Sequence, residues 1–529
     1  NNTLTYKKQF NNQSIKVLGG FSYQKQKDNT LSASAYGFPS DFYKYNNLGL
    51  GTNPQAPSSG ASKWTLISYF ARLHYILANK YILTASYRID GNSKFGANNK
   101  YGTFPSVSAA WKLGNEKFIK NLNLFSHLKL RFGYGQTGDA EIGTYQSLSS
   151  ISTSNGQFGA YAYNGKQVPI AYPNGIANPD LSWEKTKEFN YGLDMGFVND
   201  RLTISANYYD KKTTAMLLNQ PIPRQSGFSS VLDNIGKMRN TGVEVQISSE
   251  NVVSKSFNWN TSFNISGNRN KVLSLGGTNY IYTGWGIYAG NYIHGSHVTR
   301  IQVGHSVSNF YGVVYDGLWK SKKQIKNVGT MPSATPGSIR YKDLNGDGTW
   351  SPNKDSKFLG TASPKFQFGL TNNFSYKNFD LHVFIYGEYG NKVYDIPLEH
   401  TLYNGSGLSA KRVKKRWTPQ SPNNPYPAAN SGSMFTINSA DVVDASFLRF
   451  KNVTLTYHIP VSKRNNNGIF RKASIGVSVD NLAVITSYPG YDPEVNSFGG
   501  GHSPNKTKGV DRYAYPASRT IRFNLNLGF

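Results

Sequence analysis

The chain has 529 residues, no cysteine, 57 Lys and Arg against 29 Asp and Glu, and a formal net charge of +28. The lack of cysteine excludes disulfides and thiolate chemistry. The sequence contains no run of about 18 apolar residues, so it predicts no transmembrane helix. Hydrophobic residues make up 38% and aromatic residues 14%. This composition argues against a disordered chain and suits a barrel whose strands alternate lipid-facing and water-facing side chains.

Apolar and polar residues alternate along much of the chain. The first clear segments are 69–77 and 81–89, joined by a tight turn at 78–80, and the last segment is 521–529. A period of two predicts β-strands with one apolar and one polar face. Such strands fit a wall between lipid and a wet lumen. The alternative is a soluble β-sandwich, in which the apolar faces of two sheets pack together.

The number and length of the segments favour the membrane barrel. We predict an all-β transmembrane antiparallel barrel with about 15 strands of roughly ten residues, the length that crosses a bilayer at a tilt. The phase of the alternation slips between Phe450 and Val453, which predicts a β-bulge. The predicted strands are 3–10, 14–26, 65–78, 80–91, 102–114, 127–136, 185–198, 201–217, 238–250, 256–272, 364–376, 379–389, 445–460, 473–486 and 518–529.

Short and long connections alternate between these strands. Short turns on one side and long loops on the other are typical of outer-membrane barrels, and this pattern places the C-terminus on the short-turn, periplasmic side. Bacterial single-chain barrels have even strand numbers, and an open sheet edge in lipid leaves backbone groups unsatisfied. We therefore expect residues 1–529 to be the C-terminal part of a larger barrel. The long connections are 27–64, 137–184, 273–363, 390–444 and 487–517.

A series of short motifs runs from about residue 130 to the end of the chain. Each motif is weak alone, but their order makes the set specific. They are NPDLSWEKT at 178–186, YYDKKT at 208–213, NTGVE at 240–244, NISGNRN at 264–270, YKDLNGDG at 341–348, DASFLRFKNVTL at 444–455, VDNL at 479–482 and GYDPE at 490–494. Together they resemble the SusC/RagA-type TonB-dependent transporters of the Bacteroidota outer membrane.

The resemblance implies a barrel of about 22 strands filled by a plug, with the plug and the first strands not in this chain. It also implies active import of a nutrient, an oligosaccharide or a peptide, with a SusD-like surface lipoprotein as lid. Energy would come from TonB through the plug. The aromatic residue Phe529 on the last strand resembles the signal read by the barrel assembly machinery. The alternative is a barrel that imports nothing and acts as a scaffold in a surface or secretion complex.

One long loop carries a motif that is similar to the start of an EF-hand. Asp343, Asn345 and Asp347 occupy positions 1, 3 and 5, and a glycine follows at position 6, as calcium loops require. The twelfth position, which should supply a bidentate Glu, holds Lys354, and Asp355 comes one residue later. Two interpretations stay open: a calcium site formed by these four oxygen-bearing residues, or an Asx/Gly turn. No other cofactor is expected.

The loop 273–363 begins with four aromatic residues, Tyr280, Tyr282, Trp285 and Tyr288. Aromatic faces stack on sugar rings and on peptide side chains, so we predict substrate contacts for these residues. The alternative is an interfacial aromatic girdle or packing within the loop.

The excess of positive charge favours a surface that faces anionic lipid and lipopolysaccharide. For the basic run 411–416, two interpretations stay open: contact with lipopolysaccharide phosphates or an acidic lipoprotein lid, or a solvated surface. Nucleic acid is not expected as a partner, because charge alone gives only non-specific binding and no nucleic-acid motif accompanies it. The segment 133–138 matches G-x-G-x-x-G, but no helical pattern follows it, as a dinucleotide site would need. No catalytic grouping stands out, so the chain is not expected to be an enzyme.

Overall fold

The computed structural model describes residues 1–154, 160–283, 288–289, 292–293, 298–326, 334–398, 413–429, 437–460, 471–495 and 508–528. Strands dominate these ranges, and the helices α1 (Lys117–Lys120) and α2 (Lys322–Lys326) are one turn long. Short 3-10 turns cover Lys44–Asn46, Leu48–Leu50, Leu113–Asn115 and Arg224–Ser226. None of the helices in the described ranges has the length and apolar character needed to span a membrane.

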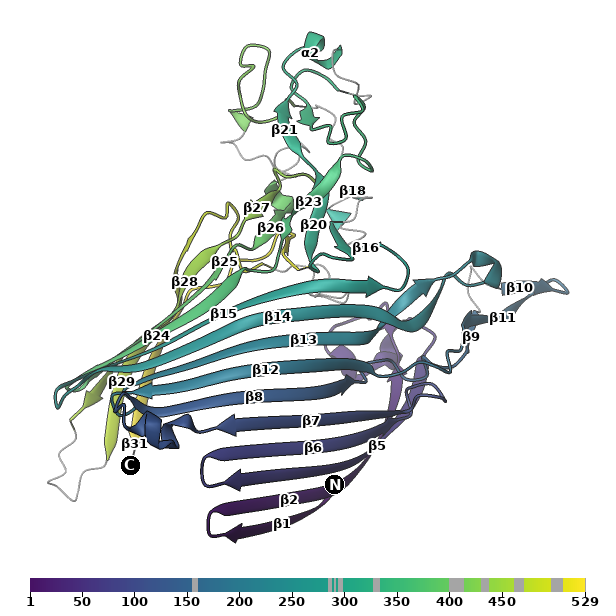
Figure 1. Ribbon diagram of the computed structural model, residues 1–529. Helices are drawn as coiled ribbons and strands as arrows, with labels where there is room; N and C mark the ends of the chain where they lie inside the picture. The colour runs from purple at the N-terminus through teal and green to yellow at the C-terminus, as the bar shows by residue number, and fades with distance from the viewer. Residues whose placement is uncertain are drawn as a thin grey trace. The chain divides into compact units, whose positions relative to one another are not determined.

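The main feature is a 15-stranded sheet in which each strand neighbours the next one along the chain (Figure 1). Within this sheet, the nine pairs of neighbouring strands whose residue pairing is described are all antiparallel. The strands are β1 (Asn2–Phe10), β2 (Gln13–Ser32), β5 (Ser58–Leu77), β6 (Tyr81–Asn92), β7 (Tyr101–Trp111), β8 (Phe125–Asp139), β12 (Glu184–Phe197), β13 (Leu202–Pro221), β14 (Ser230–Val253), β15 (Phe257–Leu275), β24 (Phe366–Tyr376), β25 (Phe379–Tyr389), β28 (Phe447–Ile459), β29 (Lys472–Thr486) and β31 (Thr520–Gly528).

Each predicted strand overlaps one strand of this sheet, and the all-β fold class is confirmed. Several observed strands are longer than predicted; β2 reaches Ser32 and β14 begins at Ser230. The predicted bulge is also present. Phe450 pairs with Ile385 and Asn452 pairs with Phe384, which leaves Lys451 as an extra residue in β28. The bulge keeps Phe450 and Val453 on the same face although three positions separate them.

The two faces of the strands differ as the alternation predicts. On β31, Phe523 and Leu525 are exposed in the chain by itself, as a lipid-facing row would be. The polar face carries charged groups that pair across strands. Arg131 of β8, for example, donates two hydrogen bonds to the carboxylate of Asp194 on β12, at 2.8 and 2.7 Å.

Tight turns join the strands where the sequence predicts them. Between β5 and β6, Ala78 and Asn79 have φ values of 52° and 51°. Positive φ at successive residues gives a turn whose twist matches that of the flanking strands. The glycine motif at 133–138 lies within β8. A side chain at Gly138 would lie 2.2 Å from a ring atom of Phe104, so this glycine permits close packing and serves no phosphate.

The chain divides into two compact units, and some strands contribute to both. The first unit comprises residues 1–111, 132–189 and 212–237. Its core is an aromatic cluster in which Trp183 packs against Phe95 and Phe104, with ring centroids 4.7 and 5.3 Å away. Leu181, which like Trp183 belongs to the NPDLSWEKT motif, is fully buried in this cluster. Its smaller strands are β3 (Ala35–Tyr36), β4 (Asn53–Pro54), β9 (Ser150–Ser154), β10 (Ala160–Tyr163) and β11 (Lys166–Gly175).

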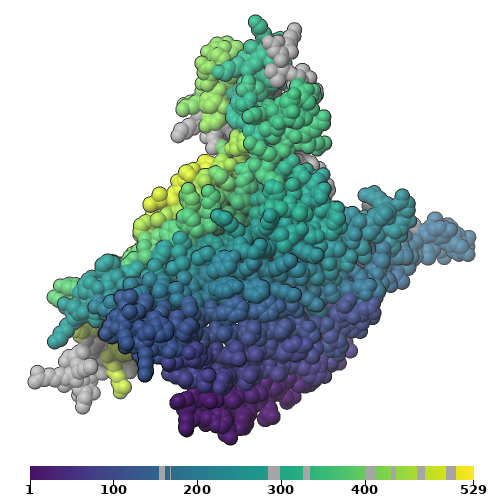
Figure 2. Space-filling view, viewed as in Figure 1, coloured from purple at the N-terminus to yellow at the C-terminus, as the bar shows by residue number. Residues whose placement is uncertain are grey.

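The second unit comprises residues 112–131, 190–211 and 238–529. Its loops fold into small sheets beyond one end of β15, β24, β25 and β28 (Figure 1), and these residues form a bulky projection (Figure 2). Two apolar clusters support them, one around Phe310 and Tyr394 and one around Trp350 and Trp417. The loop strands are β16 (Tyr280–Thr283), β17 (Tyr288–Ala289), β18 (Tyr292–Ile293), β19 (Thr299–Gln302), β20 (Asn309–Val313), β21 (Tyr315–Leu318), β22 (Ile339–Tyr341), β23 (Ser356–Thr361), β26 (Lys392–Asp395), β27 (Val442–Asp444) and β30 (Val510–Asp511).

Candidate functional site

The first candidate site lies on the four-stranded sheet β16-β19-β20-β23. One face of this sheet points into the apolar core, where Thr299 and Phe310 are fully buried. The opposite face carries Tyr280 and Tyr282 of β16, Arg300 of β19, Tyr311 of β20 and Phe358 of β23, which we call the aromatic strip. This division follows from strand alternation, because Thr299 and Arg300 are neighbours in β19 and point to opposite faces.

Arg300 lies at the centre of the aromatic strip. Its guanidinium carbon is 3.7 Å from the ring centroid of Tyr280, 4.3 Å from that of Tyr311 and 5.6 Å from that of Tyr282. These distances are those of cation–π stacking. Burial raises the pKa of Tyr282, although the charge of Arg300 opposes the increase, so the Tyr282 hydroxyl stays protonated at neutral pH.

The structure therefore brings together two of the four aromatic residues predicted to contact substrate. Tyr280 and Tyr282 lie side by side with ring centroids 5.2 Å apart, and both rings are partly exposed. Trp285 lies outside the described residues, and Tyr288 is described only as backbone in β17. Substrate contact by these residues stays a prediction. Arg300 and Tyr311 could not be predicted from the sequence, because a strand as short as β19 carries too little alternation to mark its faces.

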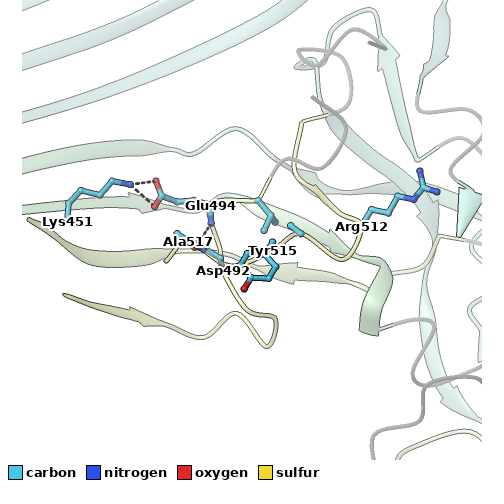
Figure 3. Close-up of a pocket in the computed structure, with 8 residues that line it drawn as sticks. Lys451, Asp492, Glu494, Arg512, Tyr515 and Ala517 are labelled. Atoms are coloured by element: carbon cyan, nitrogen blue, oxygen red, sulfur yellow. Dashed lines mark hydrogen bonds and ion pairs between the residues drawn. The ribbon is translucent and has the colours of Figure 1, made fainter. Parts of the chain in front are cut away.

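The second candidate site is a pocket of about 500 Å³ in the second unit. It lies between β28 and the last long loop, and Figure 3 shows Lys451 and Arg512 at its two ends. The bulge in β28 adds Lys451, whose ammonium lies 3.2 Å from the Glu494 carboxylate. Tyr515 lines the pocket and is 93% exposed. The pocket thus offers charges of both signs and an aromatic face.

A buried arginine supports this pocket. Arg449 is 3% exposed, and its guanidinium nitrogens lie 2.6 Å from a carboxylate oxygen of Asp492 and 2.7 Å from one of Glu494. Asp492 also accepts hydrogen bonds from the backbone amides of Glu494 and Ala517, at 2.9 and 3.3 Å. The GYDPE motif thus fixes the last loop to β28 through two carboxylates that share the charge of Arg449.

Tyr488 begins the same loop and points into the protein. Its hydroxyl donates a 2.6 Å hydrogen bond to the carboxylate of Asp511. Burial, together with the nearby negative charges of Asp395 and Asp511, raises the pKa of Tyr488 above its ordinary value of 10. The group therefore keeps its proton in the folded protein at a pH where an unfolded tyrosine ionises.

This difference predicts a loss of stability at alkaline pH. Above about pH 10 Tyr488 loses its proton in the unfolded state but keeps it in the folded state. Its ionisation should therefore lower the free energy of unfolding by up to about 1.4 kcal/mol per pH unit. We expect the free energy of unfolding to fall more steeply from about pH 9 to 11 in wild type than in Tyr488→Phe. Unfolding in detergent at several pH values measures it, with the exposed Tyr491→Phe as control. Equal slopes for wild type and Tyr488→Phe would contradict the assignment.

The residues of the predicted calcium loop also come together, in the segment between β22 and β23. Asp343 accepts hydrogen bonds from the amides of Gly346 and Gly348, at 2.7 and 2.8 Å. The hydrogen bond from the Thr349 amide is the main cause that lowers the pKa of Asp347, and the Lys354 ammonium lies 3.1 Å from this carboxylate. These contacts are those of an Asx/Gly turn. A calcium ion would have to displace Lys354.

Asp355 completes this loop from a fully buried position. Its two oxygens accept hydrogen bonds from the amides of Leu344, Asn345 and Ser351, at 2.9, 3.4 and 2.7 Å. In Asp355→Ala these three amides lose a charged acceptor, so we expect a local loss of stability of about 1–3 kcal/mol. Hydrogen exchange of residues 343–355 measures it. Unchanged protection in the variant would show that the carboxylate does not hold the loop.

Calcium binding at Asp343, Asn345, Asp347 and Asp355 stays a prediction. Within the described ranges, no group of three His, Asp or Glu side chains is placed to hold a metal ion. Calorimetric titration with calcium separates the two interpretations. Saturable binding that Asp347→Asn abolishes would establish the calcium site, and the absence of binding would leave the turn.

The long amphipathic strands and the large folded loops define the class of a membrane β-barrel with extensive extramembrane parts. The chain belongs to the family described as TonB dependent receptor-like, beta-barrel, whose model matches residues 1–482. It is 35% identical over 534 residues to TonB-dependent receptor P26 of Formosa agariphila, a match that covers 100% of this chain and 53% of that protein. It is 32% identical over 476 residues to TonB-dependent receptor SusC of Bacteroides thetaiotaomicron, a match that covers 89% of this chain and 44% of that protein.

Among solved structures, the RagAB peptide transporter is similar over the whole chain. The TM-score is 0.83 at 26% sequence identity, and the match covers 100% of this chain and 55% of that one. The resemblance to the SusC/RagA type is thus confirmed, and the chain is a barrel portion of an outer-membrane protein. Its relatives are receptors and transporters, which agrees with the expectation that it is not an enzyme. The chain spans about half the length of the relatives it matches.

Proposed function

We propose that this chain forms the C-terminal barrel portion of a TonB-dependent importer of the SusC/RagA type. The protein takes up a nutrient, an oligosaccharide or a peptide, across the outer membrane of a Bacteroidota-like bacterium. The observation that carries the proposal is the TM-score of 0.83 to the RagAB peptide transporter over the entire chain. The remaining part of the protein supplies the plug, through which TonB delivers energy.

The long loops face the outside in this proposal, and the C-terminus faces the periplasm. A SusD-like surface lipoprotein caps the loops and closes over the bound nutrient. Two features support a ligand-handling role for the loops: the aromatic strip, and the pocket with charges of both signs. Structures of the RagAB peptide importer in "open-open" and "closed-closed" states have TM-scores of 0.83 and 0.82 to this chain. The basic surface would face lipopolysaccharide.

A native pull-down from detergent-solubilised outer membranes tests the assembly. The protein that carries this chain is tagged, and everything that co-purifies is identified by mass spectrometry. We expect plug peptides in the same polypeptide and a surface lipoprotein in near-equal amount. A protein without plug sequence that co-purifies with secretion or structural components would contradict import and leave a scaffold barrel.

A further inference from the structure

Arg300 is a cation without an acidic partner in an acid-free part of the sequence. Residues 251–315 contain no Asp or Glu, so neither β16, β19 and β20 nor the connections between them supply a negative charge. Within the described ranges, Arg300 forms no ion pair with any acidic side chain, and its Nε is buried without a hydrogen-bond acceptor. Arg300 is partly buried, and even partial burial of an uncompensated cation has a cost, which makes such an arginine a site for a ligand anion.

The neighbouring rings fix the plane of the guanidinium. Two rings cannot occupy the same face of a guanidinium at 3.7 and 4.3 Å, so Tyr280 and Tyr311 cover different sides of it. Stacking on aromatic faces leaves the in-plane N–H donors of an arginine as its free edge, and this edge matches the two oxygens of a carboxylate. Nε is buried, and the Tyr282 hydroxyl forms a side-chain hydrogen bond with Arg300, so a ligand meets the remaining N–H donors of the two terminal nitrogens.

We propose that Arg300 binds a carboxylate group of the ligand, while the exposed parts of Tyr280 and Tyr282 contact the rest of that ligand. The inference rests on the proposed import function and names the chemistry of the imported nutrient. A free carboxylate is present both in peptides and in oligosaccharides that contain uronic acids. Neutral oligosaccharides lack it and gain nothing from Arg300.

Binding is measured directly on the full protein in detergent, by native mass spectrometry with two pairs of ligand pools. One pair contains short peptides with free or amidated C-termini and no acidic side chains. The other contains oligogalacturonates or their methyl esters. We expect wild type to bind one of the two acid pools at least about tenfold more tightly than its neutral counterpart, because a charge-assisted hydrogen bond contributes that much. The acid pool that binds identifies the source of the carboxylate.

Three variants connect this binding to Arg300. Arg300→Met keeps the length of the side chain and should lose the preference for the acid pool, whereas Arg300→Lys keeps the charge without the planar fork and should retain part of it. The matched control is Arg340→Met, since Arg340 also lies over an aromatic ring but already pairs with Asp316 at 3.0 Å. Circular dichroism confirms that each variant is folded.

The proposal is overturned if neither acid pool binds better than its neutral counterpart, or if Arg300→Met binds the acid pool as tightly as wild type. Binding of the neutral pools alone would remove the carboxylate site and leave the import function standing. Failure of import would instead appear in uptake by cells, which these binding measurements do not involve.

Discussion

Arg449→Met is expected to destabilise the second unit by about 3–5 kcal/mol, because it leaves the carboxylate of Asp492 buried without its cation. Asp492 is 7% exposed, and among the residues that the structure describes it would keep two backbone amide donors without Arg449. We expect residues 487–495 to lose hydrogen-exchange protection first, since Arg449 joins this segment to β28. Exchange followed by mass spectrometry and denaturant unfolding in detergent measure both effects.

Two comparisons make this prediction specific. The double variant Arg449→Met with Asp492→Asn removes the unpaired charge and should recover part of the lost stability. Arg522→Met breaks the pair with Asp480, whose N–O distance of 2.7 Å is similar, but more than half of the Arg522 side chain is exposed. This control should cost less than about 1 kcal/mol. Equal losses for Arg449→Met and Arg522→Met would refute the buried ion pair as the anchor of the loop.

Trp183→Ala should destabilise the first unit by about 3–5 kcal/mol, the usual cost of removing a large buried aromatic side chain. Trp183 is 5% exposed, contacts Phe95 and Phe104, and donates a 3.1 Å hydrogen bond from its indole nitrogen to the carbonyl of Lys100. Its loss leaves a cavity and removes this hydrogen bond, although the Lys100 carbonyl still accepts a 3.0 Å hydrogen bond from the backbone amide of Asn92. Unfolding followed by circular dichroism reports the change independently of tryptophan fluorescence.

Trp64→Ala is the matched control for this prediction. Trp64 belongs to the same unit but is only half-buried, and its side chain lies 5.1 Å below the ammonium of Lys94. Trp64→Ala should lower the free energy of unfolding by less than half as much as Trp183→Ala, because Trp64 buries less apolar area in the folded protein. A smaller loss for Trp183→Ala than for Trp64→Ala would mean that the aromatic cluster does not hold this unit together.

The strands could be predicted because each carries its own alternation. A strand such as β31 has four apolar residues on one face, at every second position from Ile521 to Leu527, and this pattern needs no knowledge of the neighbours. The bulge in β28 was readable for the same reason, since an extra residue shifts the phase within the strand itself. Strand ends could not be predicted as well, because β2 and β14 include end segments, 27–32 and 230–237, in which apolar and polar residues do not alternate.

The sites could be predicted only in part, because their partners are far apart in sequence. Tyr280 and Tyr282 stand out in a run of aromatic residues, but nothing in the sequence connects them with Arg300 or Tyr311. Arg449 and Asp492 are 43 residues apart, and their pairing depends on how the last loop folds against β28. The motifs that carry the family resemblance prove to be structural in two cases: NPDLSWEKT forms the core around Trp183, and GYDPE supplies the partner of Arg449.

Uptake by living cells tests import most directly. Cells with and without the gene are given defined mixtures of short peptides and of oligosaccharides, and depletion of each compound from the medium is followed by mass spectrometry, with and without a protonophore. We expect one class of compound to be depleted only when the gene is present and the membrane is energised. Equal depletion with and without the gene would contradict import and favour a scaffold barrel.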